Sequence, residues 1–175
     1  AYADGLAARP DWTPAKVRLG AAGIAAGLVA DGVEVLAAVR TEPSGSARFH
    51  LGLGYARLGH VDRADELWAA PGGIDDAIRA HNVATARDLL ARAALSVSNH
   101  AVAREHWQAC RDAFPEHEGY RVALAETLFR EGAELLRLGR DRQSALTSAR
   151  DRLGAAVALV PGDRRVRVQL AMAAL

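Results

Sequence analysis

The chain has 175 residues, of which 50% are hydrophobic and 25% are charged, and its formal net charge is +1. This apolar content can offset the entropy lost on folding, which excludes a disordered chain, and the near-neutral charge argues against a general polyanion binder. A single cysteine excludes a disulfide framework and a zinc site built on cysteines. No run of about 18 apolar residues occurs, so we expect no membrane insertion.

Residue usage favours helices throughout the chain. Alanine dominates, leucine, arginine and valine follow, and Lys16 is the only lysine. Alanine, leucine and arginine are strong helix formers, and long alternations of β-branched residues are absent. The sequence therefore predicts an all-α fold.

Turn residues divide the chain into a series of predicted helices. Their approximate ranges are 14–29, 31–41, 46–58, 61–70, 75–95, 100–114, 118–138, 141–160 and a last helix from about 163. Pro43, Pro115 and Pro161 lie between predicted helices, because proline cannot continue a helix. Gly27 is assigned to the interior of the first helix.

Small and large residues recur at matched positions along these helices. The clearest set is Leu51, Gly52, Tyr55, Ala64 and Trp68. Three weaker sets contain Gly20, Gly32 and Leu36, then Ala91, Ala103 and Trp107, then Gly132, Ala149 and Leu153. We expect two helices to approach closely at the small residues, with the large residues filling the space around the contact.

This pattern resembles the tetratricopeptide repeat, which has L-G-x2-Y on its first helix and A-x3-F on its second. In the clearest set, Trp68 takes the place of the second aromatic residue. The resemblance implies a right-handed α-solenoid of stacked antiparallel helix pairs. It also implies one repeat domain over residues 1–175, with repeats near 13–44, 45–73, 84–117 and 119–161 and partial repeats at both ends.

The resemblance implies a concave groove lined by the first helix of each repeat, where such proteins usually bind peptides. The groove positions of the family fall here on Phe49, Leu53, Asp88, Arg92, Phe129 and either Leu136 or Arg137, with His50 beside them. This groove is apolar with a charged middle, which favours an amphipathic helix or an apolar peptide. The Lys and Asn residues with which one subclass holds a C-terminal carboxylate are missing from these positions.

The function predicted from the resemblance is a protein-interaction scaffold or adaptor. The sequence shows no acid–base or nucleophile constellation, so we predict no catalytic residues. The six histidines show no metal-binding spacing, and no glycine-rich loop follows a strand, so neither a metal nor a cofactor is expected. Cys110 is expected to be a buried, inert thiol.

An alternative function rests on an arginine-rich face in the last third of the chain. Its members are Arg140, Arg142, Arg150, Arg152, Arg164, Arg165 and Arg167. Such a face suits a regulatory module that binds an acidic partner or nucleic acid. Nucleic acid is the less favoured ligand, because no aromatic side chain interrupts the run to stack on bases.

The last predicted helix leaves two interpretations open. Residues 166–175 are largely apolar and end without the polar cap that solenoids usually need. Either the natural chain continues past this segment, or the face packs on a second copy to form a homodimer. Residues 1–9 have no signal-peptide pattern, so we expect a cytoplasmic location, although a removed targeting segment would leave the same sequence.

Overall fold

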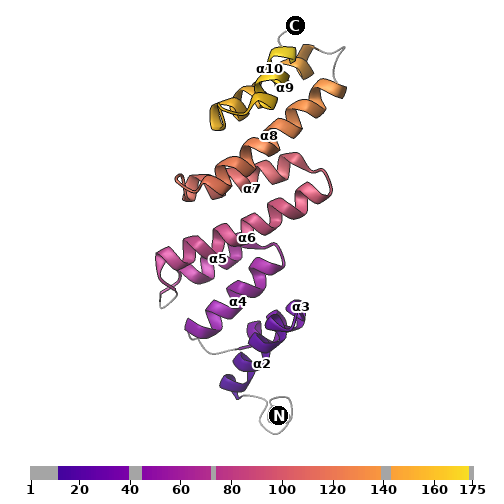
Figure 1. Ribbon diagram of the computed structural model, residues 1–175. Helices are drawn as coiled ribbons and strands as arrows, with labels where there is room; N and C mark the ends of the chain where they lie inside the picture. Colours follow the sequence, from indigo (N-terminus) through magenta and orange to yellow (C-terminus); the bar gives the residue numbers. More distant parts are fainter. Residues whose placement is uncertain (1–11, 40–44, 72–73, 139–142, 174–175) are drawn as a thin grey trace. The chain divides into compact units, whose positions relative to one another are not determined.

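The computed structural model describes residues 12–39, 45–71, 74–138 and 143–173, and every regular element in these ranges is an α-helix (Figure 1). The helices are α2 (Thr13–Ala25), α3 (Val29–Ala37), α4 (Gly45–Arg57), α5 (Val61–Ala69), α6 (Asp76–Ser96), α7 (His100–Ala113), α8 (Glu118–Leu138), α9 (Gln143–Leu159) and α10 (Arg164–Ala173). The predicted all-α fold is confirmed, and most helix ends lie close to their predicted positions.

Two predicted helix ends are wrong. The second helix was expected to reach about residue 41, but α3 ends at Ala37. The first helix was expected to continue to about residue 29, but α2 ends at Ala25. Gly27 has a φ of +89°, the left-handed conformation that glycine adopts without strain. The amide of Leu28 donates to the Gly23 carbonyl at 2.9 Å, and that of Gly27 donates to Ile24 at 3.2 Å. These bonds form a Schellman turn, which ends α2 and starts α3.

The contacts divide the chain into two compact units, Ala1–Ala86 and Arg87–Leu175, with the boundary inside α6. The first unit contains α2, α3, α4, α5 and the first part of α6. The second contains the rest of α6 with α7, α8, α9 and α10. The repeat boundaries predicted from the sequence stay a prediction.

In the first unit, α2 and α3 form an antiparallel pair with their backbones in close contact. A Cβ atom at Gly20 would lie 2.6 Å from Leu36 Cγ, and one at Gly32 would lie 2.7 Å from Gly20 O. The side chains of Ile24 and Leu36 are buried beside this contact, in one cluster with Leu51 of α4. Only glycine allows two helices to approach this closely.

The α4/α5 pair has the same close contact at a glycine, but a larger side chain, Trp68, packs against it. A Cβ atom at Gly52 would lie 2.7 Å from Cε2 of Trp68, whose side chain is 1% exposed. The indole Nε1 donates to the carbonyl oxygen of Phe49 at 3.2 Å. Ala64, one turn before Trp68, is fully buried. The indole is thus held by packing against Gly52 and by a hydrogen bond to α4.

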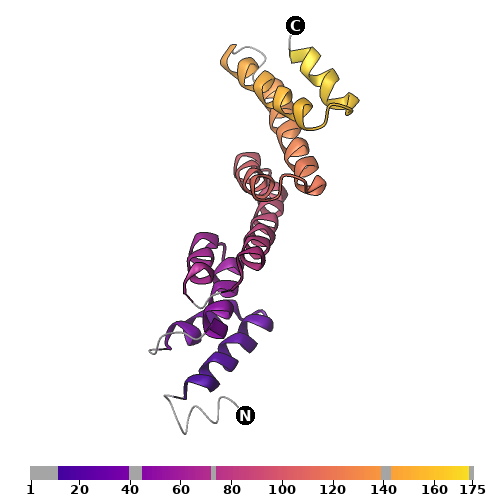
Figure 2. The ribbon, with the colours of Figure 1, turned by 90° about the vertical axis from the view of Figure 1, so that its left-hand side faces the viewer.

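In the second unit, α8 and α9 lie side by side, as the two views show (Figures 1 and 2). A Cβ atom at Gly132 would lie 2.8 Å from Leu153 Cγ. Leu153 and Ala149 are fully buried. Ala91 of α6 and Trp107 of α7, which hold the matching positions of the preceding pair, are also buried. The small and large positions predicted from the sequence are therefore core positions.

We predict opposite effects for two glycine-to-alanine substitutions. Gly52→Ala should lower the free energy of unfolding by about 1–3 kcal/mol, because its methyl group overlaps the Trp68 indole. Gly154→Ala should raise it by about 0.5–1 kcal/mol, because α9 has open space there and alanine is the better helix former. Urea denaturation of the two variants measures both effects. Equal changes in the free energy of unfolding for the two variants would contradict the close contact between α4 and α5.

A second prediction concerns the turn between α6 and α7. Ser98 has a φ of +57°, and the amide of Asn99 donates to the Ala94 carbonyl at 2.8 Å, as in the turns at Gly27 and Gly59. A side chain is disfavoured in this conformation, so Ser98→Gly should stabilise the chain by about 0.5–1 kcal/mol. The reverse exchange, Gly59→Ser, should destabilise it by a similar amount. Thermal unfolding that shows Ser98→Gly to be the less stable form would contradict the assigned turn.

Candidate functional site

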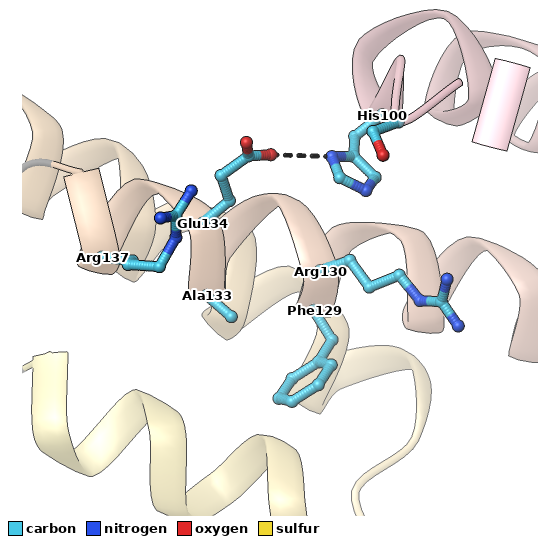
Figure 3. A pocket seen from close by; sticks show the side chains of 7 residues that line it. His100, Phe129, Arg130, Ala133, Glu134 and Arg137 are labelled. Carbon is cyan, nitrogen blue, oxygen red and sulfur yellow. Dashed lines mark hydrogen bonds and ion pairs between the residues drawn. The ribbon is translucent and has the colours of Figure 1, made fainter. Parts of the chain in front are cut away.

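An open pocket of about 360 Å³ lies on the face of α8 in the second unit (Figure 3). Most of its lining belongs to α8. The rest comes from the turn before α7 and from the first residue of α7. The lining residues are Ser98, His100, Phe129, Arg130, Ala133, Glu134 and Arg137. The α8 residues recur every three or four positions, so they share one side of the helix.

The start of α7 positions the upper wall of the pocket. Asn99 caps α7 by accepting the amide of Val102 at 3.3 Å, which fixes the first turn of the helix. His100 is the first residue of α7, and its Nδ1 lies 3.0 Å from Glu134 Oε2 on α8 (Figure 3). This contact joins the start of α7 to the C-terminal part of α8 across the pocket.

A carboxylate shared by two arginines fixes α8 from its inner side. Glu131 Oε2 lies 3.0 Å from Nε of Arg104 on α7, and its Oε1 lies 3.1 Å from Nε of Arg152 on α9. The Glu131 side chain is only 17% exposed. It precedes Gly132 as Leu51 precedes Gly52, so an ionic contact replaces the apolar contact of the clearest repeat. Glu131 therefore connects three helices beneath the pocket.

The apolar floor of the pocket is Phe129. Cζ of Arg165 on α10 lies 5.7 Å from the centre of the Phe129 ring. Nη2 of Arg165 lies 2.8 Å from Asp163 Oδ2 and 3.4 Å from Glu126 Oε2. The hydrogen bond that Arg165 donates to Asp163 raises the pKa of Arg165 and lowers the pKa of Asp163. Arg165 is thus held over one edge of the ring.

The structure brings only some of the predicted groove residues together. Phe129 and Arg137 line the pocket, whereas Leu136 is half-buried and is not among the lining residues. His100 and Glu134 were not among the predicted groove residues. Their contact depends on how α7 and α8 are aligned, which no short motif reveals.

Ala133 is the pocket residue that repeat spacing was able to reveal although it was not predicted. It follows Gly132 as Leu53 follows Gly52 and Arg92 follows Ala91, and Leu53 and Arg92 were both assigned to the groove. Its small side chain gave no reason to single it out. In the pocket, that small size leaves room between Phe129 and Arg137 on the same face of α8.

The remaining groove predictions lie elsewhere on the two units. In the first unit, the rings of Phe49 and His50 meet edge to face with their centres 5.2 Å apart, and Leu53 packs against the core cluster. In the second unit, Arg92 binds Asp88 through two hydrogen bonds of 2.9 and 3.1 Å, which raise the pKa of Arg92. These residues already have contacts within the chain.

The predicted arginine-rich face is divided by contacts within the chain. Arg150 donates to the carbonyl oxygen of Ala173, Arg152 pairs with Glu131, and Arg165 pairs with Asp163 and Glu126. Arg164 and Arg167 are exposed, and neither has a hydrogen-bonding or ionic partner in the described ranges. The predictions for Arg140 and Arg142 fall outside the described residues.

Other site chemistries are limited in the part of the chain that the structure describes. No three His, Cys, Asp or Glu side chains there are grouped so that they could hold a metal ion. Cys110 is fully buried, and burial raises the pKa of its thiol to about 11, so the reactive thiolate is scarce at neutral pH. None of the described helices has the length and apolar character needed to cross a membrane.

No protein-family profile matches the sequence, and a comparison with curated proteins finds no match. Similar solved structures include a TPR repeats protein (BF2334) from Bacteroides fragilis NCTC 9343, with 13% identity, a TM-score of 0.46 and coverage of 99% of this chain and 87% of that chain. YrrB, described as a TPR protein with an unusual peptide-binding site, has 11% identity, a TM-score of 0.43 and coverage of 99% and 81%. MamA AMB-1 has 22% identity, a TM-score of 0.34 and coverage of 90% and 85%.

Within the helix pairs, glycines of α2, α4 and α8 meet Leu36, Trp68 and Leu153 of the following helices. The small and large positions singled out in the sequence are therefore in direct contact in these three pairs.

The shared carboxylate gives a third prediction. Glu131→Gln should destabilise the chain by about 1–3 kcal/mol, because it leaves Arg104 and Arg152 without their partly buried counter-charge. Glu118→Gln is the matched control, since Glu118 is 78% exposed and its ionic partner among the described residues is Arg121 at 3.3 Å, so its loss should cost less than about 0.5 kcal/mol. Guanidinium-induced unfolding would mask ionic effects, so urea is the denaturant. Similar stabilities of the two variants would show that Glu131 does not connect the helices.

Proposed function

We propose that this chain is a protein-interaction module that binds a peptide segment of a partner protein, with the α8 pocket as its main contact. The observation that carries the proposal is that different sides of α8 make different contacts. Gly132 faces α9, Glu131 forms ion pairs with Arg104 of α7 and Arg152 of α9, and Phe129 lines an open pocket. A helix fixed on its inner sides presents a preformed surface to a ligand.

The chemistry of the pocket suits a peptide side chain. The half-exposed Phe129 ring and the Ala133 methyl group form an apolar centre, and Arg130, Glu134 and Arg137 form a polar rim. An apolar centre with a polar rim is the usual composition of a protein interface. A volume of about 360 Å³ lies at the small end of ligand sites, which favours one or two side chains over a large cofactor.

Selection from a random peptide library displayed on phage tests this proposal with the full chain as bait. Enriched sequences are synthesised with a fluorescent label, and their Kd is measured by fluorescence anisotropy. Phe129→Ala should weaken binding by about tenfold or more, because it removes the apolar floor of the pocket. Leu28→Ala is the control, since Leu28 is exposed in the turn between α2 and α3 and lies outside the predicted groove.

Two results would contradict the proposal. One is the failure of any peptide to be enriched by the folded chain. The other is a set of bound peptides whose affinities are the same for wild type and Phe129→Ala. Circular dichroism of each variant confirms that a loss of affinity is not a loss of helical structure.

A further inference from the structure

We infer that the α8 pocket selects extended peptides in which an acidic residue stands three or four positions from an apolar residue. Arg137 receives the carboxylate, and Phe129 with Ala133 receives the apolar side chain. The inference rests on the proposed function and adds the chemistry of the partner. Three observations support it. The acidic side chains of the pocket are already paired, Arg137 has no partner in the described ranges, and the spacing of Phe129 and Arg137 along α8 matches a short extended peptide.

The acidic side chains in and beside the pocket already have partners within the chain. Glu126 Oε1 lies 3.0 Å from Arg130 Nε, and its Oε2 lies 3.4 Å from Arg165 Nη2. Glu134 Oε2 faces His100 Nδ1 at 3.0 Å. A cationic peptide would have to displace these neighbours to find a carboxylate. The pocket therefore offers little to a lysine or arginine side chain.

Arg137 is the cation that remains available. It lies in the last full turn of α8, it is exposed, and it has no ionic or hydrogen-bonding partner in the described ranges. Figure 3 shows it on the same helix as Glu134, one turn farther along. A guanidinium group binds a carboxylate with two parallel hydrogen bonds, which makes it a selective receptor for an acidic side chain.

The spacing along α8 sets the distance between the two ligand groups. Phe129 and Arg137 are 137 − 129 = 8 residues apart, which corresponds to about 12 Å along a helix axis. Ala133 lies midway and leaves space for a peptide backbone. An extended peptide advances about 3.3 Å per residue, so about 12 Å corresponds to three or four peptide residues. This gives the separation stated in the proposal.

The sequences enriched from the phage library give the first test, because they should contain Asp or Glu three or four positions from an aromatic or aliphatic residue. The second test uses a synthetic fluorescent peptide of that sequence and its acid-to-amide counterpart, in which Gln replaces Glu or Asn replaces Asp. The amide peptide should bind about tenfold more weakly to the wild-type chain, since the ionic hydrogen bonds to Arg137 are lost.

Charge reversal on the protein gives the third test. Arg137→Glu should weaken binding of the acidic peptide more than tenfold. The same variant should bind more tightly a peptide in which Lys replaces the acidic residue. Arg167→Glu is the matched control, because Arg167 is equally exposed, has no partner in the described ranges and does not line the pocket. Its affinity for the acidic peptide should stay within twofold of wild type.

The outcomes separate this inference from the proposed function. Peptides that depend on Phe129 but show no acidic enrichment, and that bind Arg137→Glu as well as wild type, would overturn the acid selectivity and leave peptide binding intact. An equal loss with Arg167→Glu would also overturn it, because the effect would then come from net charge alone. The absence of any enriched peptide would overturn both.

Discussion

The whole fold depends on one contact, in which a small residue of the first helix of a pair touches a large residue of the second. Gly20 meets Leu36, Gly52 meets Trp68 and Gly132 meets Leu153, each with too little space for an added methyl group. Because the helices touch at these points, each pair has one alignment and one buried side. The opposite side of the first helix is then free for other contacts.

The second unit shows what one such free side can become. Glu131, which takes the position of an apolar residue, connects α8 to Arg104 of α7 and Arg152 of α9. His100 adds a contact from the start of α7. The contacts of Glu131 hold α8 from its inner side, and the contact of His100 with Glu134 holds the rim of the pocket. The pocket is thus a consequence of how α8 is anchored, and this is why we assign peptide binding to it.

The sequence allowed the helices and their core to be predicted, because both leave periodic signals. Turn residues marked most helix ends, and the matched small and large positions identified the buried contacts at Trp68 and Leu153. The end of α2 was missed for a physical reason. In a run rich in alanine and glycine, Gly27 in a left-handed turn looks the same as Gly20 at a helix contact. Ser98, which adopts the same turn without being glycine, carries no signal.

The candidate site was predictable only in part. Repeat spacing assigned Phe129 and Arg137 to one surface, and both residues line the pocket on α8. It did not reveal the contact of His100 with Glu134, because the two residues are 34 positions apart and meet through tertiary packing. The count of arginines also overstated the basic face, since Arg152 and Arg165 are bound by acids of α8. The charge that a surface offers to a ligand can be judged only when the ion pairs within the chain are known.

A titration of the ¹⁵N-labelled chain with a selected peptide, followed by NMR chemical shifts, shows which side of α8 the peptide occupies. If the pair contacts occupy the inner sides of α8 and the pocket binds the peptide, the amide shifts concentrate at Phe129, Ala133 and Arg137 and around His100, while amides of α9 change little. Shifts that concentrate on α9, or on α5 in the first unit, would contradict peptide binding in the pocket.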